Sequence, residues 1–465
     1  MERTVAIASS QVHKHILSSL FDQHHLMEHL HGLKEIMFLG QGAFISSLMD
    51  GLHAEFESRE SLEEIHMISL LNVFLASVGS TNAKFLPQFV TDRVQVRLLP
   101  IDDTVDSFWI TGDGDGNNNN NNGSDDADLA KDGWDIFSLG YAADAPLTAV
   151  VHPEAMEKYH LVFNLLFRLK RIEWMMNNTW RQSTVLNHTL QILISKYGTV
   201  ELGPSTSTQR ENALTRTKRL LRKFSMTRQS MLHFITNLQS YFMFEVLESG
   251  WKTLVDKLSS AKSLDEVIAS HNEYLDEIVA KSLLGESFLA NANVNAKEGE
   301  KQKQRKKGGE IYKIERQLRR VLTATFRFCK IHERIFSKAL DTIEKAGEKR
   351  RGAERKSMAG KWGFENFDPD VEGSNFFNLA GEGRLEEVEA VSEEFDICLR
   401  NLLAMLTDRI NGTAGVKDVD VNVSISSPSP LRAPVPVEAD RMQASNIDSL
   451  RFLTFRLDFS GFYGQ

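Results

Sequence analysis

Two glycines separated by one residue, Gly40 and Gly42, are the first residues of this chain whose spacing could do chemistry. A phosphate-binding loop of the Walker type ends in Gly-Lys-Ser/Thr, so that the Lys reaches phosphate and the hydroxyl holds magnesium. Here Gly42 leads into Ala43 and Phe44, with neither a Lys nor a hydroxyl. A dinucleotide loop should follow a strand, but the segment 30–39 has the pattern of a helix. The spacing therefore favours a break between two helices over a phosphate site.

A second pattern, His25-x-x-Glu28-His29, matches the H-x-x-E-H motif of inverted zinc proteases. On a helix the two His lie one turn apart and could bind zinc, with Glu28 as the general base. A third, acidic ligand is expected downstream, yet no Glu occurs between Glu64 and Glu154. We therefore keep a zinc hydrolase only as a remote alternative, and we expect neither a metal nor another cofactor.

Composition bounds the class of protein. The chain has 465 residues, of which 42% are hydrophobic, and a net charge of -9, which argues against a broad polyanion-binding surface. Its two cysteines, Cys329 and Cys398, are too few for a disulfide framework and indicate a reducing compartment. The N-terminus has no signal-peptide pattern, and no apolar run approaches the roughly 20 residues that span a bilayer. We expect a soluble intracellular protein.

Apolar residues recur at steps of three and four along most of the chain, which predicts an all-α helical bundle. Helices are expected at 153–176, at 231–246, after a capping box formed by Ser263 and Glu266, and from Ile311 to about Ile343. Strand signals are few: the segment 94–99 alternates apolar and polar residues, and 147–151 is its candidate partner.

Three polar segments bury too little apolar surface to offset chain entropy, and we expect them to be disordered insertions. They are 112–132, with its Asn tract, 296–310, rich in Lys and Gln, and 412–440, rich in Ser, Pro and Val. The predicted organisation is an N-terminal helix over residues 1–37 that leads into one helical domain over residues 38–465.

Several segments, taken in order, resemble the gamma-tubulin complex components, most closely the component three type. They are Phe38–Asp50 with its LGQG, Gly133–Leu147, Tyr159–Glu173 (YHLVFNLLFRLKRIE), Phe242–Trp251 (FMFEVLESGW) and Ser449–Phe459 (SLRFLTFRLDF). The motif residues at the two ends are Gly40, Gln41, Gly42 and Phe44, and Arg456, Leu457 and Asp458. The glycines would let two helices turn or pack closely, while Phe44, Ile45, Leu48 and Met49 fill the core. Where the family has Asp after Gly42, this chain has Ala43.

The resemblance implies the all-helical C-terminal half of such a component, which binds gamma-tubulin and helps to nucleate microtubules without being an enzyme. Gamma-tubulin and other complex components are the expected partners, with neither nucleic acid nor membrane insertion, at a microtubule organising centre or spindle pole in the cytoplasm. The family's N-terminal half, which makes lateral contacts, is expected to be missing from this chain. A generic helical scaffold or tether is the alternative, which co-precipitation with gamma-tubulin would separate.

Two helical segments are candidates for contact with gamma-tubulin. The residues are Asn164, Arg168, Lys170 and Arg171 on the first segment, and Gln239, Tyr241 and Glu245 on the second. Arg168 and Arg171 lie opposite the apolar stripe of their helix, where they could meet an acidic surface; the alternative is a solvated face. Reversing both to Glu is expected to weaken gamma-tubulin binding while leaving the helical circular dichroism unchanged.

Overall fold

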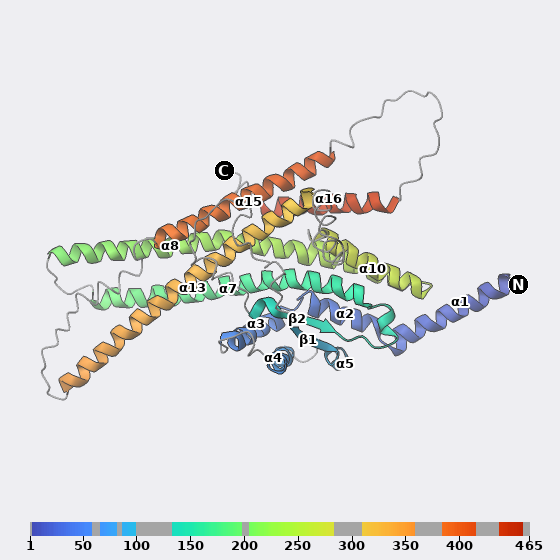
Figure 1. The fold of residues 1–465 in the computed structure, drawn as a ribbon, viewed down its shortest axis with the longest axis horizontal. Helices are drawn as coiled ribbons and strands as arrows, with labels where there is room; N and C mark the ends of the chain where they lie inside the picture. The colour runs from blue at the N-terminus through green and yellow to red at the C-terminus, as the bar shows by residue number, and fades with distance from the viewer. Residues whose placement is uncertain are drawn as a thin grey trace, which may run out of the picture.

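Long helices make up almost all of the described structure, a computed structural model, with one small sheet at its edge (Figure 1). The described residues are 2–57, 66–80, 86–98, 133–197, 204–282, 309–358, 384–414 and 437–458. This architecture confirms the predicted all-α class. Within these ranges, no helix combines the length and the apolar character that crossing a membrane requires.

The N-terminal part is a series of short helices rather than one. In order they are α1 (Glu2–Ser18), a π-helical turn η1 (Ser19–Gln23), α2 (Leu26–Met37), α3 (Gly42–Glu57), α4 (Met67–Ser80) and α5 (Gln88–Thr91). The break before α2 lies at His25, whose φ of 49° is left-handed. Leu26, Leu30 and Leu33 of α2 are buried in the same core as the later helices. The core therefore begins before residue 38, and only α1 projects away from it (Figure 1).

The turn between α2 and α3 uses a different residue from the one that the sequence suggests. Leu39, not a glycine, has the left-handed backbone, with φ 53°. A Cβ on Gly42 would meet no atom within 4 Å, and one on Gly40 would meet only the carboxylate end of Glu35, at 2.7 Å. Neither glycine is thus needed for close packing against another element's backbone. Phe44, Ile45, Leu48 and Met49 of α3 are buried, as predicted.

A two-stranded antiparallel sheet joins segments on either side of residues 99–132. Strand β1 (Val94–Leu98) pairs with β2 (Phe137–Tyr141), and Val94 faces Tyr141. The helix α6 (Gly133–Ile136) leads directly into β2. The predicted strand at 94–99 is confirmed, but the predicted partner is wrong: Leu147–Ala149 is a short 3-10 helix, η4. The whole of β2 is buried, because α7 packs on it.

The long helices form the body of the molecule. They are α7 (Pro153–Tyr197), α8 (Pro204–Ser240), the π-helix η5 (Tyr241–Glu248), α9 (Ser249–Ser260), α10 (Leu264–Lys281), α13 (Gly309–Met358), α15 (Arg384–Ala414) and α16 (Val437–Leu457). In Figure 1, α7 and α8 run side by side and α13 crosses them obliquely. Contacts of α7 with α8, α13, α10, α3 and β2 place this helix at the centre of the core.

The predicted start of α10 is confirmed at its N-cap. The Ser263 Oγ accepts a hydrogen bond from the Glu266 backbone N–H at 3.2 Å, which satisfies one free amide of the first turn. The Glu266 carboxylate, however, accepts from the Lys262 N–H, at 2.6 Å, rather than from Ser263. The reciprocal half of the box is thus displaced by one residue.

The three predicted insertions fall almost wholly outside the described residues. The segment 112–132 is entirely outside them, and 296–310 is outside except for the first two residues of α13. Of 412–440, the first three residues extend α15 and the last four begin α16. Their expected disorder, and the domain boundaries drawn around them, remain predictions.

Candidate functional site

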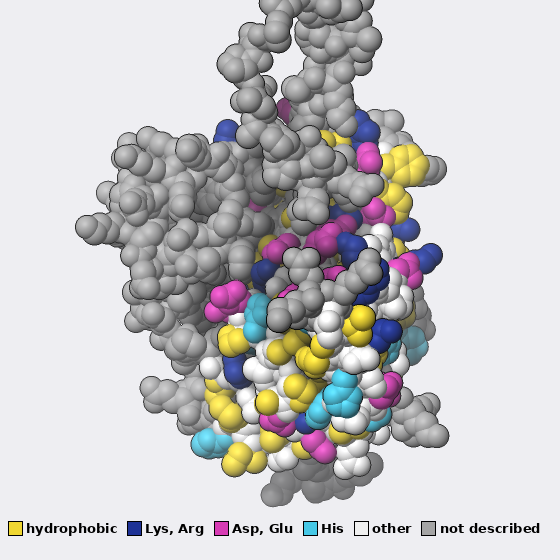
Figure 2. Space-filling view, turned by 90° about the vertical axis from the view of Figure 1, so that its right-hand side faces the viewer, with side chains coloured by type: hydrophobic (Ala, Val, Ile, Leu, Met, Phe, Trp, Pro, Cys, Tyr) yellow, Lys and Arg dark blue, Asp and Glu magenta, His cyan; other side chains and the backbone are white. Residues whose placement is uncertain are grey.

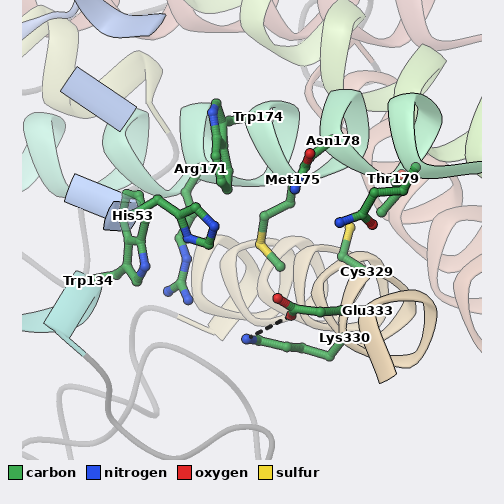
Figure 3. A pocket seen from close by; sticks show the side chains of 11 residues that line it. His53, Trp134, Arg171, Trp174, Met175, Asn178, Thr179, Cys329, Lys330 and Glu333 are labelled. Carbon is green, nitrogen blue, oxygen red and sulfur yellow. Dashed lines mark hydrogen bonds and ion pairs between the residues drawn. The ribbon is translucent and has the colours of Figure 1, made fainter. Parts of the chain in front are cut away.

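The two arginines predicted to face a partner point into the protein instead. Arg171 is only 3% exposed, and its guanidinium lies 5.1 Å from the Trp134 ring and 4.7 Å from the Phe326 ring. Arg168 is half-buried, with Nε 3.8 Å from Asp135 Oδ1. Arg171 is therefore not open to solvent, because Trp134 of α6 and Phe326 of α13 cover its guanidinium (Figure 3).

A polar contact between α7 and α8 accounts for two further candidates. The Lys170 Nζ donates to Gln239 Oε1 at 2.9 Å, and Gln239 Nε2 donates to the Leu169 carbonyl at 3.2 Å. Gln239 is buried, so it is not a surface residue. Lys170 also pairs with Glu173 at 3.0 Å. Asn164 is half-buried, and its backbone carbonyl accepts from Arg168 Nη1 at 3.4 Å. These side chains join the helices and leave little of their polar surface for a partner.

The last two candidates, Tyr241 and Glu245, connect η5 to α10 and α16 by hydrogen bonds. Tyr241 is fully buried, and its hydroxyl donates to the Lys281 carbonyl at the end of α10, at 3.0 Å. Burial raises the pKa of Tyr241 well above its ordinary value, so the phenol stays a neutral donor. The half-buried Glu245 accepts from the Ser449 Oγ of α16 at 3.4 Å. Tyr241, like Arg171 and Gln239, is thus buried, and a contact of these residues with gamma-tubulin stays a prediction.

A small hollow surrounds Arg171 (Figure 3). It lies between α7 and α13, closed at one end by His53 of α3 and Trp134 of α6. Its floor holds the Lys330–Glu333 ion pair, at 3.3 Å. Its volume of about 40 Å³ has room for about three water molecules, far less than the roughly 300 Å³ of a small-molecule site. The hollow is therefore a feature of core packing and not a ligand site.

The zinc-like pattern does not form a metal site. His25 precedes α2 in a left-handed conformation, so the two His are not presented together by one helix. His29 Nδ1 shares a hydrogen bond with the Tyr141 hydroxyl, and its ring packs against Phe89. Burial lowers the pKa of His29 to about 4. Among the described residues, no three His, Cys, Asp or Glu side chains come together as metal ligands.

An aromatic pair on η5 and α16 is the feature that sequence reasoning missed. Phe244 is 63% exposed and Phe455 is 60% exposed, although large aromatic side chains are usually buried. The two elements are in contact and are joined by the Glu245–Ser449 hydrogen bond. We call Phe244 and Phe455, two exposed side chains on neighbouring elements, the aromatic pair.

Helical periodicity contained a signal for both residues of the aromatic pair. Leu450, Leu453 and Leu457 form the buried stripe of α16, and Phe455 falls off it. Phe244 likewise falls off the apolar stripe that ends at Phe242 and Val246. Within the C-terminal motif, Arg456 lies over the Phe452 ring at 5.3 Å, so it is held against its own helix.

The end of the molecule from which α1 projects exposes apolar side chains of a different kind. Figure 2 looks onto this end: hydrophobic and His side chains mix in its lower half, while Lys, Arg, Asp and Glu gather higher up. Ile7, Val12 and Ile16 of α1 are exposed. This is a mixed surface of apolar, His and charged side chains.

Comparison with known proteins gives the arrangement a context. The family model described as "Gamma tubulin complex component C-terminal" matches residues 26–463. "Gamma-tubulin complex component 3" of Arabidopsis thaliana is 32% identical over 286 residues, which are 62% of this chain and 29% of that protein. The "Gamma-tubulin complex component 3 homolog" of Xenopus laevis is 26% identical over 450 residues, 97% of this chain and 38% of that protein. The "Spindle pole body component alp6" of Schizosaccharomyces pombe is 27% identical over 286 residues, 61% of this chain and 29% of that protein. The chain thus spans 29 to 38% of the length of these relatives.

Proposed function

The chain belongs to the gamma-tubulin complex component family, and from that premise we propose that it binds gamma-tubulin as a non-enzymatic subunit of a gamma-tubulin complex. The observation that carries the proposal is the match of the family's C-terminal region to residues 26–463, which include every described helix after α1 and η1. Relatives are named as complex components and as spindle pole body components. We propose the same setting, a microtubule organising centre or spindle pole in the cytoplasm, with other complex components as further partners.

The physical role that we propose is templating. A protein that holds gamma-tubulin beside other gamma-tubulins raises their effective concentration, and so lowers the entropic cost of starting a microtubule. Because the chain spans only 29 to 38% of its relatives, the proposal covers the holding of gamma-tubulin and leaves out ring assembly.

We assign the contact to the aromatic pair, Phe244 and Phe455. Exposed aromatic residues supply much of the binding energy in protein interfaces, because each buries a large area with few rotatable bonds. The segments that present them are joined to their neighbours by a buried hydrogen bond from Tyr241 to Lys281 and a part-buried one from Ser449 to Glu245. A surface held in this way loses little conformational entropy on binding.

The test is co-elution of the full chain with purified gamma-tubulin in size-exclusion chromatography, followed by titration. The variant Phe244→Ser/Phe455→Ser is expected to bind at least about thirtyfold more weakly, since interface aromatics each contribute over about 1 kcal/mol. The matched control is Ile68→Ser/Ile397→Ser, which changes two exposed apolar residues on α4 and α15 and should bind normally. Failure of the unmodified chain to bind would overturn the function. Normal binding by the aromatic variant would overturn only the assigned surface.

A further inference from the structure

One stretch of α7 and one of α8 contain no carboxylate side chains. In Figure 1 the C-terminal part of α7 and the N-terminal part of α8 run side by side, away from the sheet and α2. Residues 174–191 of α7 and 215–240 of α8 contain no Asp or Glu, although the chain as a whole has a net charge of -9. The exposed and half-buried cations in these two stretches are Arg181, Arg216, Lys218, Arg219, Arg222, Lys223 and Arg228. We call these two stretches the α7–α8 arm.

Three of these cations form a row on the outer face of α8. Lys218 and Arg222 are one helical turn apart, about 6 Å along the axis, and Arg219 lies beside them. The opposite face, with Leu220 and Phe224, is buried. Lys218, Arg219 and Arg222 form neither an ion pair nor a hydrogen bond with any residue that the structure describes.

Acidic residues of α15 limit the width of this row. The Thr227 Oγ1 donates to the Ser392 Oγ at 3.2 Å, which fixes α15 along one edge of α8. Beyond that contact α15 exposes Glu393 and Asp396. Burial raises the pKa of Asp396, and the charges of Arg400 and Lys223 oppose that rise. The positive surface is thus a narrow strip along α8 and not a broad basic face.

Apolar side chains accompany the strip. Met226 is exposed on the same outer face of α8, one turn after Arg222. Trp180 of α7 is exposed as well. The ends of the two helices are held together through α13, since His332 contacts both Ser183 and Phe224. The arm therefore offers charge for recognition and apolar surface for burial.

We propose that the α7–α8 arm binds an acidic, extended segment of a partner protein. Alternate side chains of an extended peptide are about 6.6 Å apart, close to the spacing of Lys218 and Arg222. A segment of about five residues rich in Glu or Asp would fit the strip without meeting the carboxylates of α15. A nucleic acid needs a wider basic footprint than a strip bordered by acids provides. This interaction is independent of the gamma-tubulin contact assigned to the aromatic pair.

The test uses the full chain and a fluorescent octaglutamate peptide, with octaglutamine as the uncharged reference, in an anisotropy titration. The triple variant Lys218→Gln/Arg219→Gln/Arg222→Gln is expected to bind octaglutamate about tenfold more weakly, from three partly screened ion pairs. The control variant Lys14→Gln/Lys252→Gln/Lys262→Gln makes the same charge change at exposed sites elsewhere and should bind normally. Wild-type affinity should also fall between about 50 and 200 mM salt.

Three results would overturn the proposal. The first is absence of octaglutamate binding by the wild-type chain at low salt. The second is an equal loss of affinity in both triple variants, which would indicate general charge attraction. The third is tighter binding of a single-stranded oligonucleotide, or of vesicles containing phosphatidylserine, that only the α8 variant loses.

Discussion

Reversing the charge of Arg171 should destabilise the folded protein, and should not act by removing a contact with a partner. The side chain is 3% exposed, with Trp134 and Phe326 on two sides of the guanidinium. Each cation–π contact at a desolvated site is worth about 1 to 2 kcal/mol. In Arg171→Glu both contacts are lost and a carboxylate is placed against two aromatic rings, where an uncompensated charge costs several kcal/mol. We expect a loss of at least about 3 kcal/mol in the free energy of unfolding.

The assay is urea unfolding followed by circular dichroism at pH 7, with three variants. Arg171→Leu removes the ring contacts without burying a charge, so its midpoint should lie between those of the wild type and Arg171→Glu. Arg181→Glu reverses an exposed charge ten residues later on the same helix and should change stability by under about 0.5 kcal/mol. Equal midpoints for Arg171→Glu and Arg181→Glu, with unchanged slopes, would refute the reasoning.

Any loss of gamma-tubulin binding by Arg171→Glu would consequently report misfolding. The expectation from sequence was the reverse, namely weaker binding with unchanged helical content. Arg171 is therefore unsuitable as a probe of the interface, whereas Phe244 and Phe455 are exposed and can be changed without opening the core.

Two further predictions concern stability. Burial lowers the pKa of His271 and of His332 to about 4, so the folded state holds both rings neutral. Each neutral ring contributes to the free energy of unfolding in full above pH ~6.5. As the pH falls toward 4, this contribution is lost, by roughly 3 kcal/mol for each ring. Urea midpoints measured at several pH values should fall with falling pH, and the slope should be shallower in His271→Gln than in the wild type. Equal slopes in the two proteins would contradict the prediction. Ala43 is exposed in the first turn of α3, and that turn has no acidic residue. Ala43→Asp should therefore raise the free energy of unfolding by about 0.5 kcal/mol, because a carboxylate interacts favourably with the positive end of the helix dipole. Ala54→Asp, in the last turn, should lower the melting temperature instead, and shifts of the same sign would argue against a dipole effect.

Helix positions were predictable because they depend on local spacing. The stripe through Phe234, Ile235 and Leu238 is buried as its steps of three and four require. Ser263 caps α10 because its side chain reaches an amide only three residues away. In the turn before α3, periodicity identified Phe44 and Leu48 as core residues but did not find that Leu39 adopts the left-handed conformation.

The pairing of strands was not predictable in the same way. Val94 and Tyr141 are 47 residues apart, and the alternation within 94–99 is compatible with many partners. The sequence suggested 147–151, which is apolar and nearer to α7. The structure instead pairs β1 with 137–141, because this segment, with every residue buried, lies between β1 and α7.

The sequence by itself determined the helical class, the stripes that enter the core and the ordered motifs that place the chain in its family. Only the tertiary structure decided which polar residues are accessible. Periodicity identifies the strongest apolar face of a helix, but a central helix such as α7 is covered on several faces, so Arg171 and its neighbours are enclosed by α6, α8 and α13. Periodicity places Phe244 and Phe455 off the apolar stripes of their helices, but only the packing of η5, α10 and α16 decided that both side chains stay exposed.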